Sequence, residues 1–323
     1  MTTVDTVVHA IAFACPTGTS RTYELRPADP TTPLPAFEAG AHVDVHLGPT
    51  LIRQYSLLNS PQDSDRYLIC VRRDDGGRGG SAAMHQDITV GQRLRVSTPH
   101  NLFPLLPAKR YVLVAGGIGI TPLLSMADEL AARGVDFTLH HYASAAAEAP
   151  LLERIRNSAF TDRVHPHRSD EGDSIRTALP AELSSPDPSA LVYICGPDGF
   201  MRHVTDTATA AGWQPGQLHL ERFAPAAWGT RPRHRRRVPG PRRQHRRQLP
   251  RTGRDDHRRS PHRPRRRRRA LLRTGMCGAC LTPVLAGEPD HRDEVQTDEE
   301  RAANTQITIC CSRSRSAELV LGL

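Results

Sequence analysis

The sequence has almost no lysine and no long apolar run. Lys109 is the single lysine among 43 lysine and arginine residues, so arginine carries the positive charge. No apolar stretch approaches the roughly 18 residues that a membrane-spanning helix needs. The first residues, Met1 to Asp5, include an acid where a secretory peptide would carry positive charge. These absences predict a soluble, cytoplasmic protein.

Cysteine is too sparse and too unevenly placed for a disulfide framework. The 323 residues include seven cysteines, and Cys277, Cys280, Cys310 and Cys311 gather near the C-terminal end. In a large chain without a secretory signal, this clustering indicates a metal or redox centre. The length also predicts two or three domains, each with its own core.

The formal net charge of +9 is concentrated in residues 229–269. This segment holds 19 arginines against two aspartates, a net +17, which leaves −8 on the rest of the chain. Its only sizeable apolar residues are Val238 and Leu249, so it is predicted to be disordered. Such a stretch could bind nucleic acid or another polyanion by releasing counterions. No aromatic residue is interleaved with the arginines, which weighs against a dedicated single-strand binder.

Residues 1–107 alternate apolar and polar positions in short runs separated by turn residues. This pattern predicts a small antiparallel β-barrel. The expected strands are 43–47, 53–57, 67–71 and 93–96.

Residues 108–228 follow a different pattern. A buried strand at 111–115 leads through a glycine turn into an amphipathic helix at 122–133 and a second strand at 136–140. This order is typical of the βαβ unit of a parallel sheet. A later strand at 190–194, followed by a helix at 200–211, is expected to extend the same sheet.

Residues 270–323 return to ordinary protein composition after the arginine-rich segment. Strand-like runs are expected at 281–285, 306–309 and 319–321, with an acidic turn through Glu300 between the first two.

One strand of the barrel region carries a cation, a flat ring and a hydroxyl within four residues. Arg53, Tyr55 and Ser56 would suit the phosphate and ring system of a flavin. An amphipathic strand that binds no ligand would have the same residue pattern, so that interpretation stays open here.

A glycine-rich turn follows the strand at 67–71. Arg78, Gly80 and Ser81 precede an expected helix at 82–87, where backbone amides could face a phosphate at the helix N-terminus. A glycine-rich hairpin without a ligand remains the alternative.

Two further glycine motifs each follow a buried strand. The first contains Gly116, Gly117, Gly119 and Thr121, and the second contains Cys195, Gly196 and Pro197. Glycines at such a turn let the pyrophosphate of a dinucleotide approach the backbone. The two motifs are predicted to lie at adjacent carboxyl ends of the sheet. After a last strand at 217–220, Phe223 could cover one face of a flavin, or it could be a core aromatic.

These motifs, in this order, resemble the phthalate dioxygenase reductase family, including the reductase components of vanillate O-demethylases. The resemblance covers nearly the whole chain except residues 229–269. It implies a flavin-binding antiparallel barrel at 1–107 and a parallel-sheet NAD-binding α/β domain at 108–228. It also implies a C-terminal plant-type ferredoxin-like α+β domain with a 2Fe–2S cluster at 270–323.

The resemblance also implies the role of each motif. FMN would be held by Arg53, Tyr55, Ser56, Arg78, Gly80 and Ser81. The nucleotide would be held by Gly116, Gly117, Gly119, Thr121, Gly196 and Pro197, with Cys195 and Phe223 beside the hydride path. Electrons would pass from NADH through FMN to the cluster and then, singly, to a Rieske-type terminal oxygenase or demethylase.

The nucleotide is expected to be NADH and not NADPH. Residues 142–146, after the second strand of the sheet, contain no arginine or lysine to meet a 2′-phosphate.

The cysteine pattern of the cluster is incomplete. A plant-type cluster needs a cysteine, four residues, a second cysteine, two residues, a third, and a distant fourth. Cys277, Cys280 and Cys310 fit the last three, but Leu272 stands where the first belongs. The cluster step is therefore expected to be impaired, which leaves a cluster-less NADH:flavin or acceptor reductase as an alternative. A zinc site at the cysteines is another.

We hypothesise that residues 229–272 are an out-of-frame reading of a GC-rich gene. The apolar strands expected there are replaced by arginine, proline and histidine, and sequence that resembles the family resumes at Arg273. The coding DNA tests this hypothesis: one of the other two frames must give an apolar segment that ends in a cysteine just before Arg273.

Overall fold

The computed structural model describes residues 2–48, 51–146, 149–177, 179–223, 281–293, 296, 298–309, 311–316 and 318–322. The chain divides into two compact units, Met1–Ala226 and Ala227–Leu323. The arginine-rich segment and the three predicted ligands Cys277, Cys280 and Cys310 lie outside the described residues. In the described chain, no helix has the length and apolar character to cross a bilayer.

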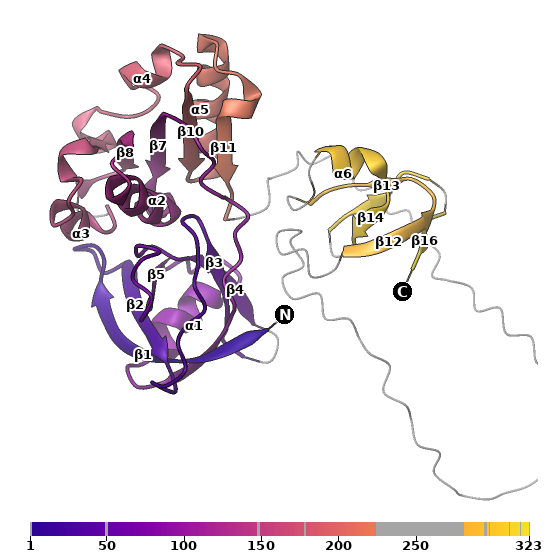
Figure 1. Ribbon diagram of the computed structural model, residues 1–323, viewed down its shortest axis with the longest axis horizontal. Coiled ribbons are helices and arrows are strands. Elements are labelled where there is room, and N and C mark those ends of the chain that lie inside the picture. The colour runs from indigo at the N-terminus through magenta and orange to yellow at the C-terminus, as the bar shows by residue number, and fades with distance from the viewer. Residues whose placement is uncertain are drawn as a thin grey trace, which may run out of the picture. The chain divides into compact units, whose positions relative to one another are not determined.

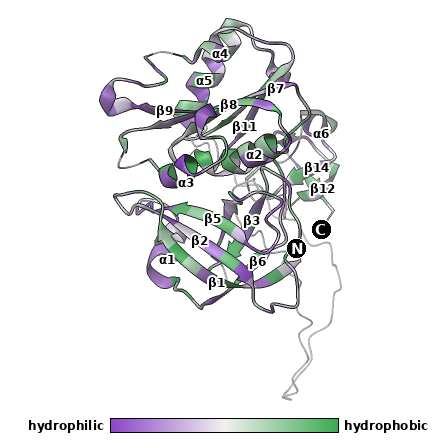
Figure 2. Cartoon of the chain, turned by 60° about the vertical axis from the view of Figure 1, so that its left-hand side comes forward, coloured by the Kyte–Doolittle hydropathy of each residue, from purple (hydrophilic) through white to green (hydrophobic). Residues whose placement is uncertain are grey.

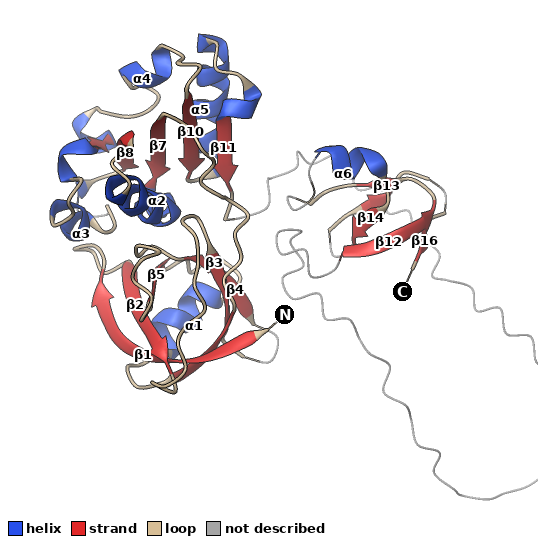
Figure 3. Cartoon of the chain, in the orientation of Figure 1, coloured by secondary structure: helices blue, strands red, loops and turns tan. Residues whose placement is uncertain are grey.

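The first half of the N-terminal unit is a six-stranded antiparallel barrel (Figure 3). Its strands are β1 (Thr3–Phe13), β2 (Ser20–Pro27), β3 (His42–His46), β4 (Ile52–Ser56), β5 (Tyr67–Arg72) and β6 (Arg93–Ser97). The sheet order is β4-β3-β6-β1-β2-β5, and a bridge between Leu57 and Ile69 joins its two outer strands. The helix α1 (Gly80–Asp87) packs against the barrel.

The barrel forms because its strands bury alternate residues. Hydrophobic and hydrophilic residues are mixed along β1 and β2 (Figure 2), and the alternate residues Thr6 and Val8 of β1 and Tyr23 and Leu25 of β2 are buried, as expected where one side of a strand faces a core. Tyr23, Leu25, Val43 and Val45 are all fully buried in this core. The Tyr23 hydroxyl donates to the carbonyl of Met84 at 2.7 Å, which fastens α1 to the sheet.

The second half of the N-terminal unit is a five-stranded parallel sheet (Figure 1). Its strands, in the order β11-β10-β7-β8-β9, are β7 (Arg110–Gly116), β8 (Asp136–Ala143), β9 (Val164–Arg168), β10 (Ala190–Cys195) and β11 (Leu218–Glu221). Its helices are α2 (Ile120–Ala132), α3 (Leu152–Arg156), α4 (Ala181–Ser184) and α5 (Asp198–Ala211). Short 3₁₀ turns occur at Gly117–Gly119, Thr161–Arg163, Ser169–Glu171 and Pro215–Gln217.

The parallel sheet is buried on both faces, which explains its continuous apolar strands. On one face, Leu113 and Tyr193 pack with residues of α2. On the other face, Val112, Val192 and Trp213 pack with residues of α5.

Two tyrosines fasten the segment that joins the barrel to the sheet. The Tyr193 hydroxyl donates to the carbonyl of Pro104 at 2.9 Å and accepts from the Leu106 amide at 2.8 Å. The Tyr111 hydroxyl donates to the carbonyl of Leu106 at 2.7 Å and accepts from the Ala108 amide at 2.8 Å. Both rings lie in the sheet core, so the joining segment is fixed to the sheet along its length.

The described part of the C-terminal unit is small. It contains β12 (Leu281–Ala286), β13 (Pro289–Asp290), α6 (Asp298–Ala303), β14 (Gln306–Thr308), β15 (Arg313–Ser314) and β16 (Val320–Leu321). Three strands pair in the order β14-β12-β16, and β13 pairs with β15. Leu285 on β12 is 67% exposed and Val320 on β16 is 42% exposed, so apolar side chains of this sheet remain uncovered.

The predicted fold class is confirmed, since both an antiparallel barrel and a parallel sheet with helices on its two faces are present. The prediction of an acidic turn through Glu300 is wrong, because α6 forms there. The strands β1, β2 and β9 were not predicted individually.

Replacing Tyr193 with phenylalanine is expected to destabilise the protein. Two hydrogen bonds to the joining segment would be lost, at a cost of about 1–3 kcal/mol in the free energy of unfolding. Denaturant unfolding followed by tryptophan fluorescence measures this change. Tyr142→Phe is the matched control, because the buried Tyr142 hydroxyl has no hydrogen-bond partner among the described residues. Equal stability of the two variants would contradict the assignment.

Candidate functional site

The two glycine motifs of the parallel sheet meet at its carboxyl edge. β7 and β10 are parallel neighbours, and Ala115 pairs with Cys195 in their register. A Cβ atom on Gly119 would lie 2.2 Å from the Cys195 carbonyl oxygen. A Cβ atom on Gly196 would lie 3.0 Å from the Cα of Gly116. The predicted adjacency of the motifs is therefore confirmed, and their backbones pack without room for side chains.

Gly117 is the open position of the first turn. Its φ of +55° is left-handed, and a Cβ atom there would meet nothing within 4 Å. Thr121 follows in the first turn of α2, and its hydroxyl donates to the carbonyl of Ile118 at 3.1 Å. A partly exposed glycine turn before a helix is the arrangement that accepts a pyrophosphate.

In the barrel, Arg53 lies along the start of α1. Its guanidinium donates to the carbonyl of Arg78 and, at 2.8 Å, to the carbonyl of Ile52. A Cβ atom on Gly80 would lie 2.3 Å from the Cγ of Arg53, so only glycine leaves room for this side chain. Sequence positions 53 and 78–80 therefore come together as the motifs predicted.

The N-terminus of α1 is available to an anion. Gly79 has a left-handed φ of 79°, and within the described structure no side chain caps this helix. The Ser81 hydroxyl instead accepts from the Asp74 amide at 3.0 Å. Free amides of a first helical turn beside Arg53 and Arg78 fit a terminal phosphate group.

Ser56 and Glu221 link the barrel to the parallel sheet. The Ser56 hydroxyl, at the end of β4, donates to the Glu221 Oε2 at 3.4 Å. Glu221 ends β11 and pairs in register with Cys195 at the end of β10. A hydroxyl, a thiol and a carboxyl group thus lie where the flavin motif and the nucleotide motif meet.

Burial sets the protonation of this group. It raises the pKa of Glu221 to about 8, and the hydrogen bond from Ser56 offsets only part of this effect. Burial also raises the pKa of the Cys195 thiol well above its usual value. Cys195 is therefore a neutral thiol at neutral pH, and Glu221 is largely protonated.

Glu221 is the site residue that sequence reasoning missed. Its signal in the sequence is an acid at the last position of the final strand of the sheet, Leu218–Glu221. Phe223 is 42% exposed, so the alternative of a core aromatic is wrong. Its role beside a flavin stays a prediction.

Among the described residues, no group of three or more histidine, cysteine, aspartate or glutamate side chains could hold a metal ion. Cys311, the neighbour of the predicted ligand Cys310, lies in the described chain. Its sulfur lies 3.3 Å from the Thr308 hydroxyl, in a turn where Thr308 donates to the buried Asp293 at 2.9 Å. The cluster prediction itself falls on Cys277, Cys280 and Cys310, outside the described chain.

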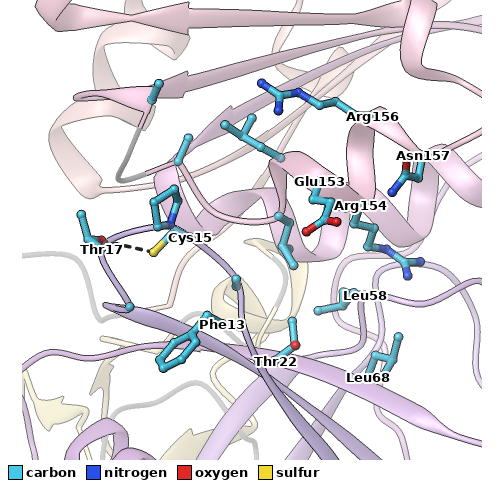
Figure 4. Close-up of a pocket in the computed structure, with 17 residues that line it drawn as sticks. Phe13, Cys15, Thr17, Thr22, Leu58, Leu68, Glu153, Arg154, Arg156 and Asn157 are labelled. Carbon is cyan, nitrogen blue, oxygen red and sulfur yellow. Dashed lines mark hydrogen bonds between the residues drawn. The ribbon is translucent and has the colours of Figure 1, made fainter.

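A pocket of about 1270 Å³ lies between the barrel and the parallel sheet, apart from the predicted site residues (Figure 4). The β1–β2 turn around Cys15 forms one wall, and α3 with Glu153 and Arg154 forms another. Its lining mixes apolar residues with charges of both signs, so it indicates no particular ligand.

Comparison with known proteins gives close relatives over most of the chain. A vanillate O-demethylase oxidoreductase from Pseudomonas sp. (strain HR199 / DSM 7063) is 43% identical over 298 residues, 90% of this chain and 91% of the relative. The solved phthalate dioxygenase reductase, described as a modular structure for electron transfer from pyridine nucleotides to [2Fe–2S], is 31% identical with a TM-score of 0.69. The match covers 99% of this chain and 98% of that one. The chain belongs to the phthalate dioxygenase reductase family.

Similar proteins also include the reductase subunit of a different oxygenase system. The carnitine monooxygenase reductase subunit of Escherichia coli (strain K12) is 36% identical over 301 residues, 90% of each chain. No model of a known protein family matches the sequence. As a member of the phthalate dioxygenase reductase family, the chain is an NADH-dependent flavoprotein oxidoreductase.

Because the pKa of Glu221 is higher in the folded protein than in the unfolded chain, the free energy of unfolding falls as the pH rises. The folded protein holds the proton up to about pH 8, whereas the unfolded chain loses it near the ordinary value of 4.5. Stability from this group is therefore full below pH 4.5 and is lost progressively between there and about pH 8. Glu221→Gln is expected to remove this loss.

Thermal unfolding of wild type and variant at pH 5 and pH 9 measures the effect. The variant should lose less stability than wild type between the two values. Glu38→Gln, which replaces an exposed carboxylate of the barrel, should follow wild type. Parallel curves for Glu221→Gln and wild type would contradict the burial of this carboxyl group.

Proposed function

We propose that the chain takes a hydride from NADH onto a bound FMN, as the reductase component that feeds single electrons through a 2Fe–2S cluster to an oxygenase partner, and that Leu272 in place of a ligand cysteine impairs the cluster step in this chain. The observation that carries this proposal is the meeting of Ser56, Cys195 and Glu221 between the flavin motif and the nucleotide motif. A domain division at 1–107, 108–228 and 270–323 belongs to the same proposal.

The phosphate of the flavin would bind at the start of α1. Arg53 and Arg78 supply cations there, and Gly80 and Ser81 supply first-turn amides. The lack of a side-chain cap in the described structure and the close fit of Arg53 against Gly80 support this assignment. A helix terminus that receives a terminal phosphate favours FMN over FAD.

The ring system of the flavin would lie beside Tyr55 and Ser56, with Phe223 on its exposed side. When bound, the flavin supplies the exchange between two-electron and one-electron transfer. The protein residues orient it: Tyr55 is held by packing against the barrel core, and Ser56 is held by its bond to Glu221.

The nucleotide would bind over the carboxyl edge of the parallel sheet. Gly117 leaves open space for the pyrophosphate, while Gly116, Gly119 and Gly196 allow the two turns to approach. Thr121 lies in the first turn of α2, and Pro197 is the N-cap residue of α5. NADH is favoured because Ala143, at the end of β8, and Ser144 and Ala145, which follow it, offer no cation for a 2′-phosphate.

Glu221 and Ser56 would hold a proton beside the flavin and nicotinamide rings. With a pKa of about 8, Glu221 can hold a proton at neutral pH within reach of the Ser56 hydroxyl. Cys195, fully buried at the end of β10, would exclude water from this position.

The partner would be the terminal component of an oxygenase system, which we propose to be of the Rieske type. Relatives are named as parts of vanillate O-demethylase, carnitine monooxygenase and phenoxybenzoate dioxygenase systems. Because reductases so similar belong to systems with such different substrates, substrate choice would reside in the partner.

A second candidate function is a cluster-less NADH:acceptor reductase. Leu272 at the position of the first cluster cysteine favours it, because leucine cannot coordinate iron. The flavin and nucleotide residues all precede residue 224, so this activity would not need the cluster.

Purified protein reconstituted with FMN is expected to be yellow, to bleach on addition of NADH, and to reduce ferricyanide. Arg53→Ala should weaken FMN binding about tenfold, because a charge-assisted bond to the phosphate is lost. Arg93→Ala, on an exposed residue of β6, should bind FMN like wild type. Protein that takes up no FMN and leaves NADH unoxidised would refute the proposal.

The cluster step is tested by the iron-to-flavin ratio. An intact cluster gives about two irons per flavin, and we expect a ratio far below this in the reconstituted protein. Ferricyanide reduction should persist while a cluster-dependent oxygenase receives no electrons. A full complement of iron with reduction of such a partner would exclude the cluster-less function.

A further inference from the structure

Four polar side chains form a row, here called the histidine row, across the outer edge of the parallel sheet. Asp173 Oδ2 lies 2.8 Å from His167 Nδ1, and His167 Nε2 lies 3.1 Å from His140 Nδ1. At the far end, His140 Nε2 faces Glu182 Oε2 at 3.5 Å. The row joins the segment after β9 to β9, β8 and α4, and none of its members belongs to the proposed flavin or nucleotide site.

The histidine row is one hydrogen short whenever both histidines are neutral and both acids are charged. Each of its three contacts needs one hydrogen between the two heavy atoms. A neutral imidazole carries one N–H, and a carboxylate carries no hydrogen. Two histidines therefore supply two hydrogens for three contacts, whichever tautomers they adopt. One added proton supplies the third, on whichever member of the row it resides, and every contact can then be a hydrogen bond.

The contact between His140 and Glu182 is the long one. Its 3.5 Å exceeds an ordinary hydrogen bond, and His140 Nε2 has no hydrogen-bond partner of normal geometry among the described residues. His140 is 4% exposed, and burial lowers the pKa of its ring to about 4, although Glu182 acts in the opposite direction. A charge on this ring is therefore disfavoured. The added proton is better placed on His167, whose ring contacts the Asp173 carboxylate directly.

Neighbouring rings and charges hold the histidine row in line. His165 stacks on His140 with ring centroids 5.0 Å apart, and Tyr142 stacks on His167 at 4.1 Å with an interplanar angle of 8°. Arg168 donates to the carbonyl of His167 at 2.8 Å. Within the described chain, the titratable and charged side chains around the two rings are His141 and Tyr142 of β8, His165 and Arg168 of β9, Glu182 of α4, and Asp173.

Tyr142 connects the histidine row to the nucleotide turns by direct packing. Its ring also contacts Phe200 of α5, with centroids 5.5 Å apart. Phe200 lies against both turns, since a Cβ atom on Gly116 would be 2.9 Å from its Cδ1 and one on Gly196 would be 2.8 Å from it. Movement of His167 would therefore shift two packed rings that support the glycine turns.

We infer that the histidine row is a pH-sensitive latch on the nucleotide turns. With one proton taken up, three hydrogen bonds tie Glu182 and Asp173 to the paired strands β8 and β9, and the latch is closed. When this proton is lost as the pH rises, one contact loses its hydrogen, and the latch opens at its long end between His140 and Glu182. The inference rests on the proposed nucleotide site, because the latch acts on the affinity for NADH.

Two amide substitutions distinguish a latch from a row with a purely structural role. In Glu182→Gln the new amide can donate to His140 Nε2, so three hydrogens serve three contacts without an added proton. Asp173→Asn supplies the third hydrogen from the other end of the row. Either variant should stay closed at all pH values, whereas Glu182→Ala removes the contact and should stay open. The Asp173 side chain is 52% exposed, so Asp173→Asn tests the latch even if Glu182→Gln fails to fold.

Histidine-selective ¹⁵N NMR of the full chain, without NADH, follows the protonation of the two rings. In wild type, the ring nitrogens of His140 and His167 should change together in one step. The step should move at least about one pH unit lower in Glu182→Gln and in Asp173→Asn, because an amide supplies the hydrogen that the proton otherwise provides. Independent titration of the two rings in wild type, or an unmoved step in both amide variants, would overturn the inference.

Glu129→Gln is the matched control for this titration. The Glu129 side chain is 25% exposed, against 22% for Glu182, but it contacts Arg133 on its own helix instead of a histidine. Its removal should leave the shared step where it is in wild type. A shift as large as that of Glu182→Gln would assign the effect to general charge and not to the latch.

Steady-state reduction of ferricyanide by the FMN-loaded proteins gives the KM for NADH. Wild type and Glu182→Gln should have the same KM at pH 6, where both are closed. At pH 9 the KM of wild type should be about fivefold higher than that of Glu182→Gln, with little difference in kcat. Glu182→Ala should show the higher KM at both pH values. Glu221 titrates in all three proteins, so the differences between them report the latch.

Equal KM values for wild type and Glu182→Gln at pH 9 would overturn the link between the histidine row and the nucleotide turns. Absence of NADH oxidation in every protein, wild type included, would instead count against the proposed function. The NMR titration needs no activity, so it would still decide whether the row takes up the shared proton.

Discussion

Close packing of two backbone turns is the constraint on which the nucleotide half of the molecule depends. The carbonyl of Cys195 occupies the space where a side chain of residue 119 would begin, and a Cβ atom on Gly196 would lie 3.0 Å from the Cα of Gly116. This contact holds the ends of β7 and β10 at one level. The open backbone of Gly117 and the buried thiol of Cys195 follow from that arrangement. Backbone packing therefore requires glycine at these positions, whether or not a ligand is bound.

At the same edge of the sheet, the barrel contacts the end of β11, beside the nucleotide turns. Ser56 reaches Glu221 across the two halves, and Glu221 keeps its proton because burial disfavours its charge. A protonated carboxyl group, a hydroxyl and a thiol make a neutral lining. A neutral lining suits an electron-transfer site, because it adds no fixed charge beside the rings it would hold.

Much of this organisation could be predicted from the sequence. The glycine motifs and the buried strands before them predicted the parallel sheet and the adjacency of its turns, since local pattern and backbone geometry determine both. The strand β1 was missed because a register shift between Val8 and Ala10 breaks its alternation. The edge strand β9 was missed because Val164–Arg168 contains Pro166 and two histidines and carries no apolar alternation.

Features that depend on tertiary contacts could not be predicted in the same way. The pKa of Glu221 is raised by burial in the folded protein, which no local sequence pattern encodes. The hydrogen bonds between Asp173 and His167 and between His167 and His140 likewise form only when β8 and β9 pair in the folded sheet.

The tyrosine bonds to the joining segment have a consequence for how such proteins can diverge. Pro104, Leu106 and Ala108 are each held by a hydroxyl from the sheet core, so the number of residues between barrel and sheet is fixed at this point. An insertion there would move at least one carbonyl or amide away from its ring. Insertions and deletions between homologues should therefore occur in surface loops, while the number of residues in this joining segment stays constant.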